Sequence, residues 1–358
     1  MKISRLVLMV LLLQMTYSQA FSQSSISDIK LGAYYFDGWT GNNKYQLSPF
    51  LTDNFPERKP IWGWVTSTQE IMDKQIIAAQ TNGISFFSFC WFNNSDKALG
   101  VDDKNNALKL FMQSKNKSKL NFNILVANHK GYFIKKTQWN ALVNYWCELF
   151  KDPSYVKIDG KPLISFISIS SMVDEFGGAA GVNEALRLLK KRAKQKGFND
   201  IIVSGCVNTS WSDINQAEKC GFDALTSYNF HRTGFSKSLN EVKSINSMQV
   251  AEKKAWTYIS KGRTLPIIPT VTLNWDKRPI DMNTKYISSR YTGYSGESVY
   301  NSVRNCRSWI NQNSQNVVGS KSKYAILYAW NEYSEGAWLT PSVKLNNELL
   351  QGVKSAMD

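Results

Sequence analysis

The chain has 358 residues, of which 43% are hydrophobic and 20% charged, and its formal net charge is +15. Such a chain can bury a large core, arranged either as two domains or as one large α/β barrel. With only two histidines and no C-x-x-C spacing among its five cysteines, it lacks the patterns of a disulfide scaffold or a zinc site, so we expect no metal and no cofactor.

The positive charge is concentrated in two lysine-rich runs, at residues 115–119 and 190–196. We interpret these runs as solvated helix faces and helix ends. The functional alternative is attraction to an anionic glycan or to a cell surface. No recognisable nucleic-acid module accompanies the charge, so a nucleic-acid partner is not expected.

The N-terminus has the pattern of a secretory signal peptide. Lys2 and Arg5 precede a short apolar run at 6–13, and small residues follow, with cleavage expected after Ala20 or Gln23. The apolar run is too short to span a bilayer, and no later stretch approaches about 20 apolar residues, so no membrane span is expected. We therefore predict a signal peptide at 1–23 and an exported protein of the periplasm, the extracellular space or the cell surface.

Short apolar segments rich in β-branched and aromatic residues alternate with longer amphipathic segments. The eight strand candidates are 30–36, 83–91, 122–127, 163–167, 201–206, 224–228, 267–273 and 325–329. The helix candidates are 67–81, 104–115, 137–150, 182–196, 214–219, 247–260 and 297–312. This alternation predicts a (β/α)8 TIM barrel as a single catalytic domain at 24–358, with a doubly wound open sheet as the rival.

In a barrel, chemistry gathers at the carboxyl ends of the strands. The residue types at those ends here are typical of sugar binding, because they combine aromatic rings with hydrogen-bonding side chains. The predicted substrate-binding residues are Tyr34, Tyr35, Asp37, Trp39, Trp91, Asn128, His129, Tyr228, His231, Trp275, Asp276, Arg278, Trp330, Asn331 and Trp338. A core role would account for some of the aromatic residues among them.

Glu332 and Glu335 follow the last predicted strand, three residues apart and among aromatic residues. Acid/base chemistry on a sugar needs one carboxyl group that keeps its proton and one that stays ionised. On a helix-like turn the two Cβ atoms would lie about 5–6 Å apart, which suits a retaining geometry. Glu335, flanked by aromatic residues, is the better candidate for a raised pKa. The alternative is a pair of exposed loop acids.

Several motifs resemble one known family, and they occur in its order over nearly the whole chain after residue 23. The chain is similar to the glycoside hydrolase family 99-like proteins, in particular to the WbsX-like branch. The matching pieces are Gly32-Ala-Tyr34-Tyr35, Gly83-Ile-Ser-Phe86-Phe87, Asp152-Pro153-Ser-Tyr155, Asp159-Gly160-Lys161-Pro162-Leu163, Asn274-Trp275-Asp276 and Ala329-Trp330-Asn331-Glu332-Tyr333-Ser334-Glu335-Gly336.

The resemblance implies a (β/α)8 barrel, a carbohydrate substrate and retaining hydrolysis through a 1,2-anhydro sugar. It assigns Glu332 as the base for the substrate's own 2-hydroxyl group, and Glu335 as the acid that protonates the leaving oxygen and then activates water. The chain departs from the WbsX-like pattern after the third strand, where Asn-Glu is usual and Asn128-His129 stands here. Specificity is therefore expected to differ from that of the mannosidases.

Two other functions remain open. The WbsX name implies a glycosyltransferase, although nucleotide-sugar donors are cytoplasmic and the signal peptide predicts export. Asp102-Asp103, the one acidic pair that could suggest a diphosphate site, is interpreted as a solvated loop pair. A non-catalytic glycan-binding protein of a surface uptake system is the second alternative, and the presence of both Glu332 and Glu335 weighs against it.

Overall fold

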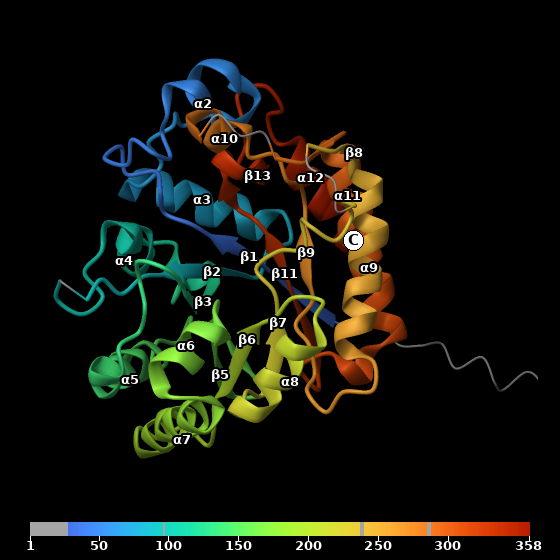
Figure 1. Cartoon of the computed structure of the whole chain (residues 1–358). Coiled ribbons are helices and arrows are strands. Elements are labelled where there is room, and N and C mark those ends of the chain that lie inside the picture. The colour runs from blue at the N-terminus through green and yellow to red at the C-terminus, as the bar shows by residue number, and fades with distance from the viewer. Residues whose placement is uncertain (1–27, 96, 237–239, 285–287) are drawn as a thin grey trace, which may run out of the picture.

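The computed structural model describes residues 28–95, 97–236, 240–284 and 288–358, so the predicted signal peptide lies outside the described residues. Within these residues, eight parallel strands form the centre of the molecule (Figure 1). They are β1 (Asp28–Tyr35), β2 (Phe86–Trp91), β3 (Asn121–Val126), β5 (Lys161–Phe166), β6 (Ile202–Cys206), β7 (Ala224–Thr226), β9 (Thr270–Thr272) and β11 (Ser322–Tyr328).

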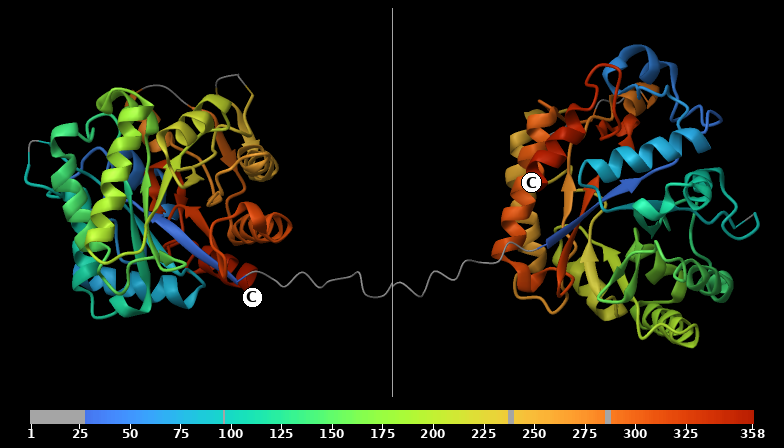
Figure 2. Two further views of the ribbon diagram at one scale, coloured as in Figure 1. Left: turned by 90° about the horizontal axis from the view of Figure 1, so that it is seen from below. Right: turned by 180° about the vertical axis from the view of Figure 1, so that it is seen from behind.

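The strands follow one another around a ring in the order β7-β6-β5-β3-β2-β1-β11-β9. Between β7 and the residues just before β9, a parallel bridge joins Leu225 to Ile267, and the amide of Ile268 donates to the carbonyl of Leu225 at 2.8 Å. These bonds join the two ends of the sheet, so the strands form a closed ring within the surrounding helices (Figure 2). The predicted barrel is therefore confirmed, and the open-sheet alternative is wrong.

Helices surround the strands on the outside (Figure 1). The seven predicted helices all occur, as α3 (Gln69–Thr81), α4 (Asn106–Gln113), α5 (Trp139–Leu149), α7 (Ala179–Gln195), α8 (Trp211–Cys220), α9 (Ile245–Ser260) and α11 (Gly296–Gln312). The sequence pattern did not predict the helices α2 (Pro49–Asn54), α6 (Ile169–Phe176), α10 (Arg278–Thr284) and α12 (Glu348–Met357). It also missed the short strands β4 (Lys157–Ile158), β8 (Val242–Ser244), β10 (Arg290–Thr292), β12 (Asn331–Glu332) and β13 (Ala337–Trp338).

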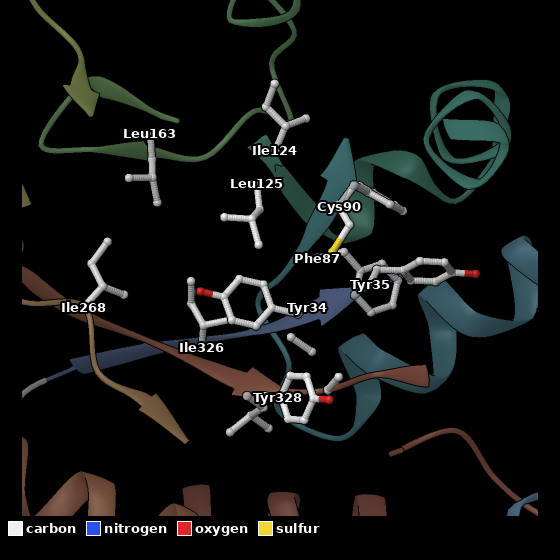
Figure 3. Close-up of a cluster of buried hydrophobic side chains, with 14 of the residues drawn as sticks. Tyr34, Tyr35, Phe87, Cys90, Ile124, Leu125, Leu163, Ile268, Ile326 and Tyr328 are labelled. Atoms are coloured by element: carbon white, nitrogen blue, oxygen red, sulfur yellow. The ribbon is translucent and has the colours of Figure 1, made fainter. Parts of the chain in front are cut away.

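The strand β1 shows why successive residues at the carboxyl ends have different surroundings. Side chains along a strand point alternately to its two faces. Tyr34 and Tyr35 accordingly point to opposite sides of β1 (Figure 3). Tyr34 reaches across the barrel interior and donates to the carbonyl of Ser227 at 2.9 Å, whereas the hydroxyl of Tyr35 accepts from Gln75 of α3 at 3.1 Å.

The strand β9 covers only Thr270–Thr272 of the predicted segment 267–273, and its last residue bonds outside the sheet. The amide of Thr272 donates to the carboxylate of Glu252 on α9 at 2.6 Å, and its hydroxyl accepts from the amide of Phe230 at 2.8 Å. Burial raises the pKa of Glu252 to about 8, although the bonds from Thr272 act against the rise. A buried helix carboxyl group thus takes the place of a neighbouring strand.

All five cysteines lie in the described residues, and each is a free thiol. These thiols form no disulfide within the described part of the chain. Cys90 is buried, while Cys206 is only partly buried. In the described part of the chain, no helix combines the length and apolar character needed to cross a bilayer.

Candidate active site

A cavity of about 420 Å³ opens at the carboxyl ends of the barrel strands. This is the end of the barrel at which enzymes of this fold carry their chemistry. Six strands contribute residues to its wall, directly or through the loops that follow them. The lining residues are Phe36, Asn43, Tyr45, Gln46, Cys90, Phe92, Lys104, Ala127, His129, Tyr132, Ile167, Tyr228, Glu332 and Glu335.

Glu332 and Glu335 reach this cavity because the chain turns back sharply after β11. The strands β12 and β13 pair antiparallel, with Glu332 opposite Ala337, and a 3-10 turn at Tyr333–Glu335 joins them. Gly336 closes the turn at φ +80°, and a Cβ atom there would lie 2.9 Å from the carbonyl oxygen of Asp276. Glycine meets both the backbone conformation and the close approach.

Each carboxyl group of the pair has its own tyrosine partner. The hydroxyl of Tyr228, from the loop after β7, donates to Oε1 of Glu332 at 2.5 Å. The hydroxyl of Tyr328, the last residue of β11, donates to Oε2 of Glu335. Tyr228 was among the predicted site residues, whereas Tyr328 was hidden in an apolar strand run. The alternation of side chains along β11 is the signal that could have identified it.

Burial and mutual proximity change the acidity of the pair. Burial first, and then the charge of Glu335, raise the pKa of Glu332 well above its usual range, and the bond from Tyr228 only partly opposes this. Burial also raises the pKa of Glu335, opposed by Tyr328 and by the charge of Lys277. The sequence singled out Glu335 alone for a raised pKa. Because the structure raises both, the pair can hold one proton and one charge together, as acid/base chemistry requires.

A buried ion pair holds the turn that carries the two glutamates. Arg58 is 2% exposed, and its Nη2 lies 2.6 Å from the carboxylate of Asp276. Its Nη1 donates to the backbone carbonyls of Asp276 and Tyr333 at 3.0 and 2.8 Å. Arg278 bonds the same carboxylate at 2.7 Å. Burial lowers the pKa of Arg58 to about 10, and Asp276 opposes that change. Asp276 and Arg278, predicted to bind substrate, are thus engaged with each other, and Asp276 also pairs with Arg58.

Four predicted tryptophans near the ends of β1, β2 and β11 lie in the core and not among the lining residues. They are Trp39, Trp91, Trp330 and Trp338. Trp91 packs against Trp146 of α5, and Trp330 donates to Gln75 of α3 at 2.6 Å. Cys90 lines the cavity, so its strand neighbour Trp91 must face the helices. The same core location holds for Tyr35.

Several other predicted residues build the frame behind the cavity. Asn331 accepts from the amide of Phe36 at 2.9 Å, and Asn128 exchanges two bonds with the backbone of Ser168. Asp37 accepts from Ser67 and from the amide of Ala107. Burial raises the pKa of Asp37 to about 6, and those two bonds moderate the rise. These side chains join neighbouring loops to one another.

His231 and Trp275 form a stacked pair beside the glutamates. Their ring centroids lie 3.6 Å apart with an interplanar angle of 14°, and the Trp275 ring lies 6.5 Å from that of Tyr328. Desolvation lowers the pKa of His231 to about 3, which keeps the imidazole neutral. The pair therefore adds an uncharged surface next to Tyr328.

The wall formed by the loops after β2 and β3 is different in character. His129 lies at the cavity and packs against Phe92 and Tyr132. Partial desolvation by these neighbours lowers the pKa of His129. Lys104 and Tyr132 also line the cavity, and the sequence analysis did not single out either. No pattern in the sequence shows that these loops meet.

Residues that could hold a metal ion are not grouped at this site. Among the described residues, no cluster of three or more His, Cys, Asp or Glu side chains has an arrangement suited to a metal. The groups at hand are instead two neighbouring carboxyl groups, two tyrosine hydroxyls, a lysine and aromatic faces. Such a set can move protons at a bond held within the cavity.

Comparisons with known proteins agree with the fold. The family model described as glycosyltransferase WbsX matches residues 63–353. The chain is similar to the family 99 endo-α-mannosidase from Bacteroides thetaiotaomicron, at 16% identity and a TM-score of 0.62, over 92% of this chain and 96% of that one. A structure named a glycoside hydrolase-like protein gives 15% identity and a TM-score of 0.64, over 93% and 94%.

A human protein, YKL-39, described as a pseudo-chitinase that retains chitooligosaccharide binding, gives 12% identity and a TM-score of 0.50, over 92% of this chain and 99% of that one. A search of curated proteins finds no match. Because these identities are low, the likeness to solved structures shows the barrel fold and no more.

Proposed function

The chain belongs to the WbsX family, and from this premise we propose that it is an exported glycoside hydrolase acting on a poly- or oligosaccharide. Its barrel is of the glycoside hydrolase type. Hydrolysis, and not transfer to another sugar, is the reaction that we assign to it. The substrate is a carbohydrate, and the reaction as proposed needs no cofactor.

One observation carries the proposal: Glu332 and Glu335 line a single cavity, and the pKa values of both are raised. A neutral carboxylic acid can protonate the oxygen of a leaving sugar, while a nearby carboxylate accepts a proton or stabilises positive charge. The tyrosine partners orient the two groups separately, so each can have a distinct role.

The proposed chemistry follows the resemblance to family 99. With the one proton of the pair on Glu335, the ionised Glu332 takes the proton from the substrate's 2-hydroxyl group, and the 2-oxygen attacks the anomeric carbon. The bond to the leaving oxygen breaks as that oxygen takes the proton from Glu335. Water then gives a proton to Glu335 and opens the 1,2-anhydro sugar at the anomeric carbon, and the 2-oxygen recovers its proton from Glu332. Two inversions give net retention.

The family name supports glycosyl transfer as a second candidate. The two reactions differ in the acceptor, which is water in hydrolysis and a sugar hydroxyl in transfer. Incubation with an oligosaccharide in ¹⁸O-labelled water separates them. Hydrolysis places the label on the anomeric carbon of the new reducing end. Transfer joins that carbon to an oxygen of the sugar acceptor, so the product carries no label.

The decisive experiment compares Glu335→Gln, Glu332→Gln and the native protein on α-mannans, rhamnose-containing polysaccharides and host glycans. We expect each substitution to lower kcat by about 10²–10⁴-fold, because each removes one proton-transfer group. The control is Glu70→Gln, which removes an exposed carboxylate on α3. NMR of the first product should show retained configuration; inverted product, or full activity of Glu335→Gln, would exclude the assigned roles.

Export is tested separately, by recovering the protein from the periplasm or the medium of cells that express the full chain. We expect its first residue to be Phe21 or Ser24, as cleavage after Ala20 or Gln23 would leave.

A further inference from the structure

The active-site cavity has one acidic end and one basic end. Glu332 and Glu335 form the acidic end, and Lys104 is the lysine among the lining residues. Its side chain is 26% exposed, so the ammonium group is only partly surrounded by water. The proposed reaction uses the acidic end and gives Lys104 no role.

Lys104 is held in place by aromatic neighbours. Its Nζ donates to the hydroxyl of Tyr132 at 2.6 Å. The same atom lies 4.9 Å from the centre of the Tyr132 ring and 5.5 Å from that of Phe92. These contacts restrict a side chain that would otherwise be flexible, so the charge is positioned before any ligand arrives.

The charges around Lys104 leave room for an anion. Its nearest carboxylate, that of Asp102, lies 3.8 Å away and also accepts the backbone amide of Lys104 at 3.0 Å. The imidazole of His129, with its lowered pKa, adds a hydrogen-bonding group at the same wall. At 3.8 Å the ammonium group makes no direct hydrogen bond with Asp102, so it keeps donors for a ligand beyond the one directed at Tyr132.

Ligand binding would strip water from this ammonium group. A neutral sugar offers only hydroxyl groups in return, whereas a carboxylate or sulfate forms charge-assisted bonds that are roughly twice as strong. The glutamates would repel an anion at the other end of the cavity, so the favourable position is next to Lys104. The positive net charge of the chain, most of which lies outside the predicted signal peptide, would also attract a polyanionic chain to the protein.

We infer that the substrate is an anionic glycan whose carboxylate or sulfate group pairs with Lys104, on a sugar next to the bond that the glutamates cleave. This inference rests on the proposed function, because it places the charged sugar in the same cavity as the reacting one. Lys104 is then a specificity-determining residue, supported by Tyr132.

Binding is measured by calorimetry in a Glu335→Gln background, so that no ligand is cleaved. The probes are α-mannan oligosaccharides, the same pool after chemical sulfation, and alginate oligosaccharides, which carry uronate carboxylates. We expect at least one anionic pool to bind at least about tenfold more tightly than the neutral pool. The sulfated and uronate pools show which anion fits, and 0.5 M NaCl should reduce the preference.

Adding Lys104→Met should remove this preference without weakening the neutral pool, and Lys104→Arg should retain most of it. Lys109 is an exposed lysine on α4, outside the cavity. Lys109→Met removes the same charge as Lys104→Met and should leave the preference for anionic pools unchanged. Equal affinity for neutral and anionic pools, failure of both anionic pools to bind, or an equal loss on all pools in Lys104→Met would overturn the inference.

The proposed function has its own readout, which is cleavage by the protein with Glu335 intact. Cleavage of neutral glycans with no charge preference would overturn the role of Lys104 alone. Charge-selective binding without any cleavage would overturn the hydrolase alone. The comparison of neutral with anionic pools needs no variant at Lys104, so it tests whether the substrate is anionic even if a substitution there impairs folding.

Discussion

The two walls of the cavity are built in different ways. The wall with the glutamates is a buried turn, in which Glu332 is 5% exposed and Arg58 bonds to backbone and side chain beneath it. The opposite wall consists of partly exposed side chains such as Lys104 and Tyr132, carried by two separate loops. The difference indicates a division of labour. Proton transfer needs fixed geometry, whereas substrate selection can reside on side chains that vary without disturbing the fold.

The largest expected effect comes from breaking the ion pair of Arg58 with Asp276, which supports the wall that carries the glutamates. Asp276→Asn would leave Arg58 buried without its carboxylate partner, and we expect unfolding free energy to fall by about 3–5 kcal/mol. Denaturant unfolding checks this value. Glu70→Gln, which breaks the exposed pair with Lys74, is the control and should change stability far less. Equal effects of the two substitutions would show that the support contributes no more than a surface ion pair.

The stabilisation from the same ion pair should be lost in acid, when Asp276 becomes protonated. Burial alone would raise the pKa of Asp276, but the bonds from Arg278 and the charge of Arg58 together hold it below its usual value of 3.8. A carboxyl group with a lowered pKa in the folded state stabilises the fold above its unfolded pKa, and this contribution is lost as the pH falls through the folded value. Asp276→Asn should therefore remove part of the loss of stability on acidification below about pH 4.

A smaller effect should separate the roles of the two glutamates. In a bell-shaped pH–activity profile, the acid limb reports the group that must be ionised and the basic limb the group that must be protonated. The bond from Tyr228 holds the pKa of Glu332 down, so Tyr228→Phe should raise it and move the acid limb to higher pH. The bond from Tyr328 holds the pKa of Glu335 down, so Tyr328→Phe should move the basic limb to higher pH.

Each tyrosine substitution should also lower kcat/KM by about tenfold, as expected for one hydrogen bond to a charged group. Rates measured from pH 4 to pH 9 give both quantities for each variant. If both substitutions moved the same limb, Glu332 and Glu335 would not have the separate roles assigned here.

The smallest effect is expected at the opposite wall. Tyr132→Phe removes the hydroxyl that accepts from Lys104 and should lower unfolding free energy by less than about 1 kcal/mol, because both side chains are partly exposed. Thermal or denaturant unfolding measures the difference. A loss as large as that of Asp276→Asn would contradict the contrast between the two walls.

Much of the fold could be predicted because its signals are local. Hydrophobic periodicity identified eight strands and seven helices in the correct order. The segment at 267–273 shows the limit, since only Thr270–Thr272 forms a regular strand. At its start, Ile267 instead forms single bridges to Leu225 and Val317, which are contacts between distant parts of the sequence.

The candidate site was predicted unevenly for the same reason. Glu332 and Glu335 stand out locally, and the structure brings both to one cavity with Tyr228. Trp91 and Trp330 were expected at the cavity because they end strands, but each faces a helix. Neighbouring side chains on a strand point to opposite faces, so an error of one residue assigns a side chain to the wrong face. The sequence does not locate strand ends to within one residue.

The sequence by itself determined the order of strands and helices, the two glutamates after the last strand and the chain's positive charge. Only the tertiary structure decided which side chains face the cavity and which groups form the wall opposite the glutamates. The bonds that settle this join residues far apart in the chain, as in Tyr228 with Glu332 and Arg58 with Asp276. Local patterns predict elements, whereas burial and pairing across the barrel decide the chemistry of each carboxyl group.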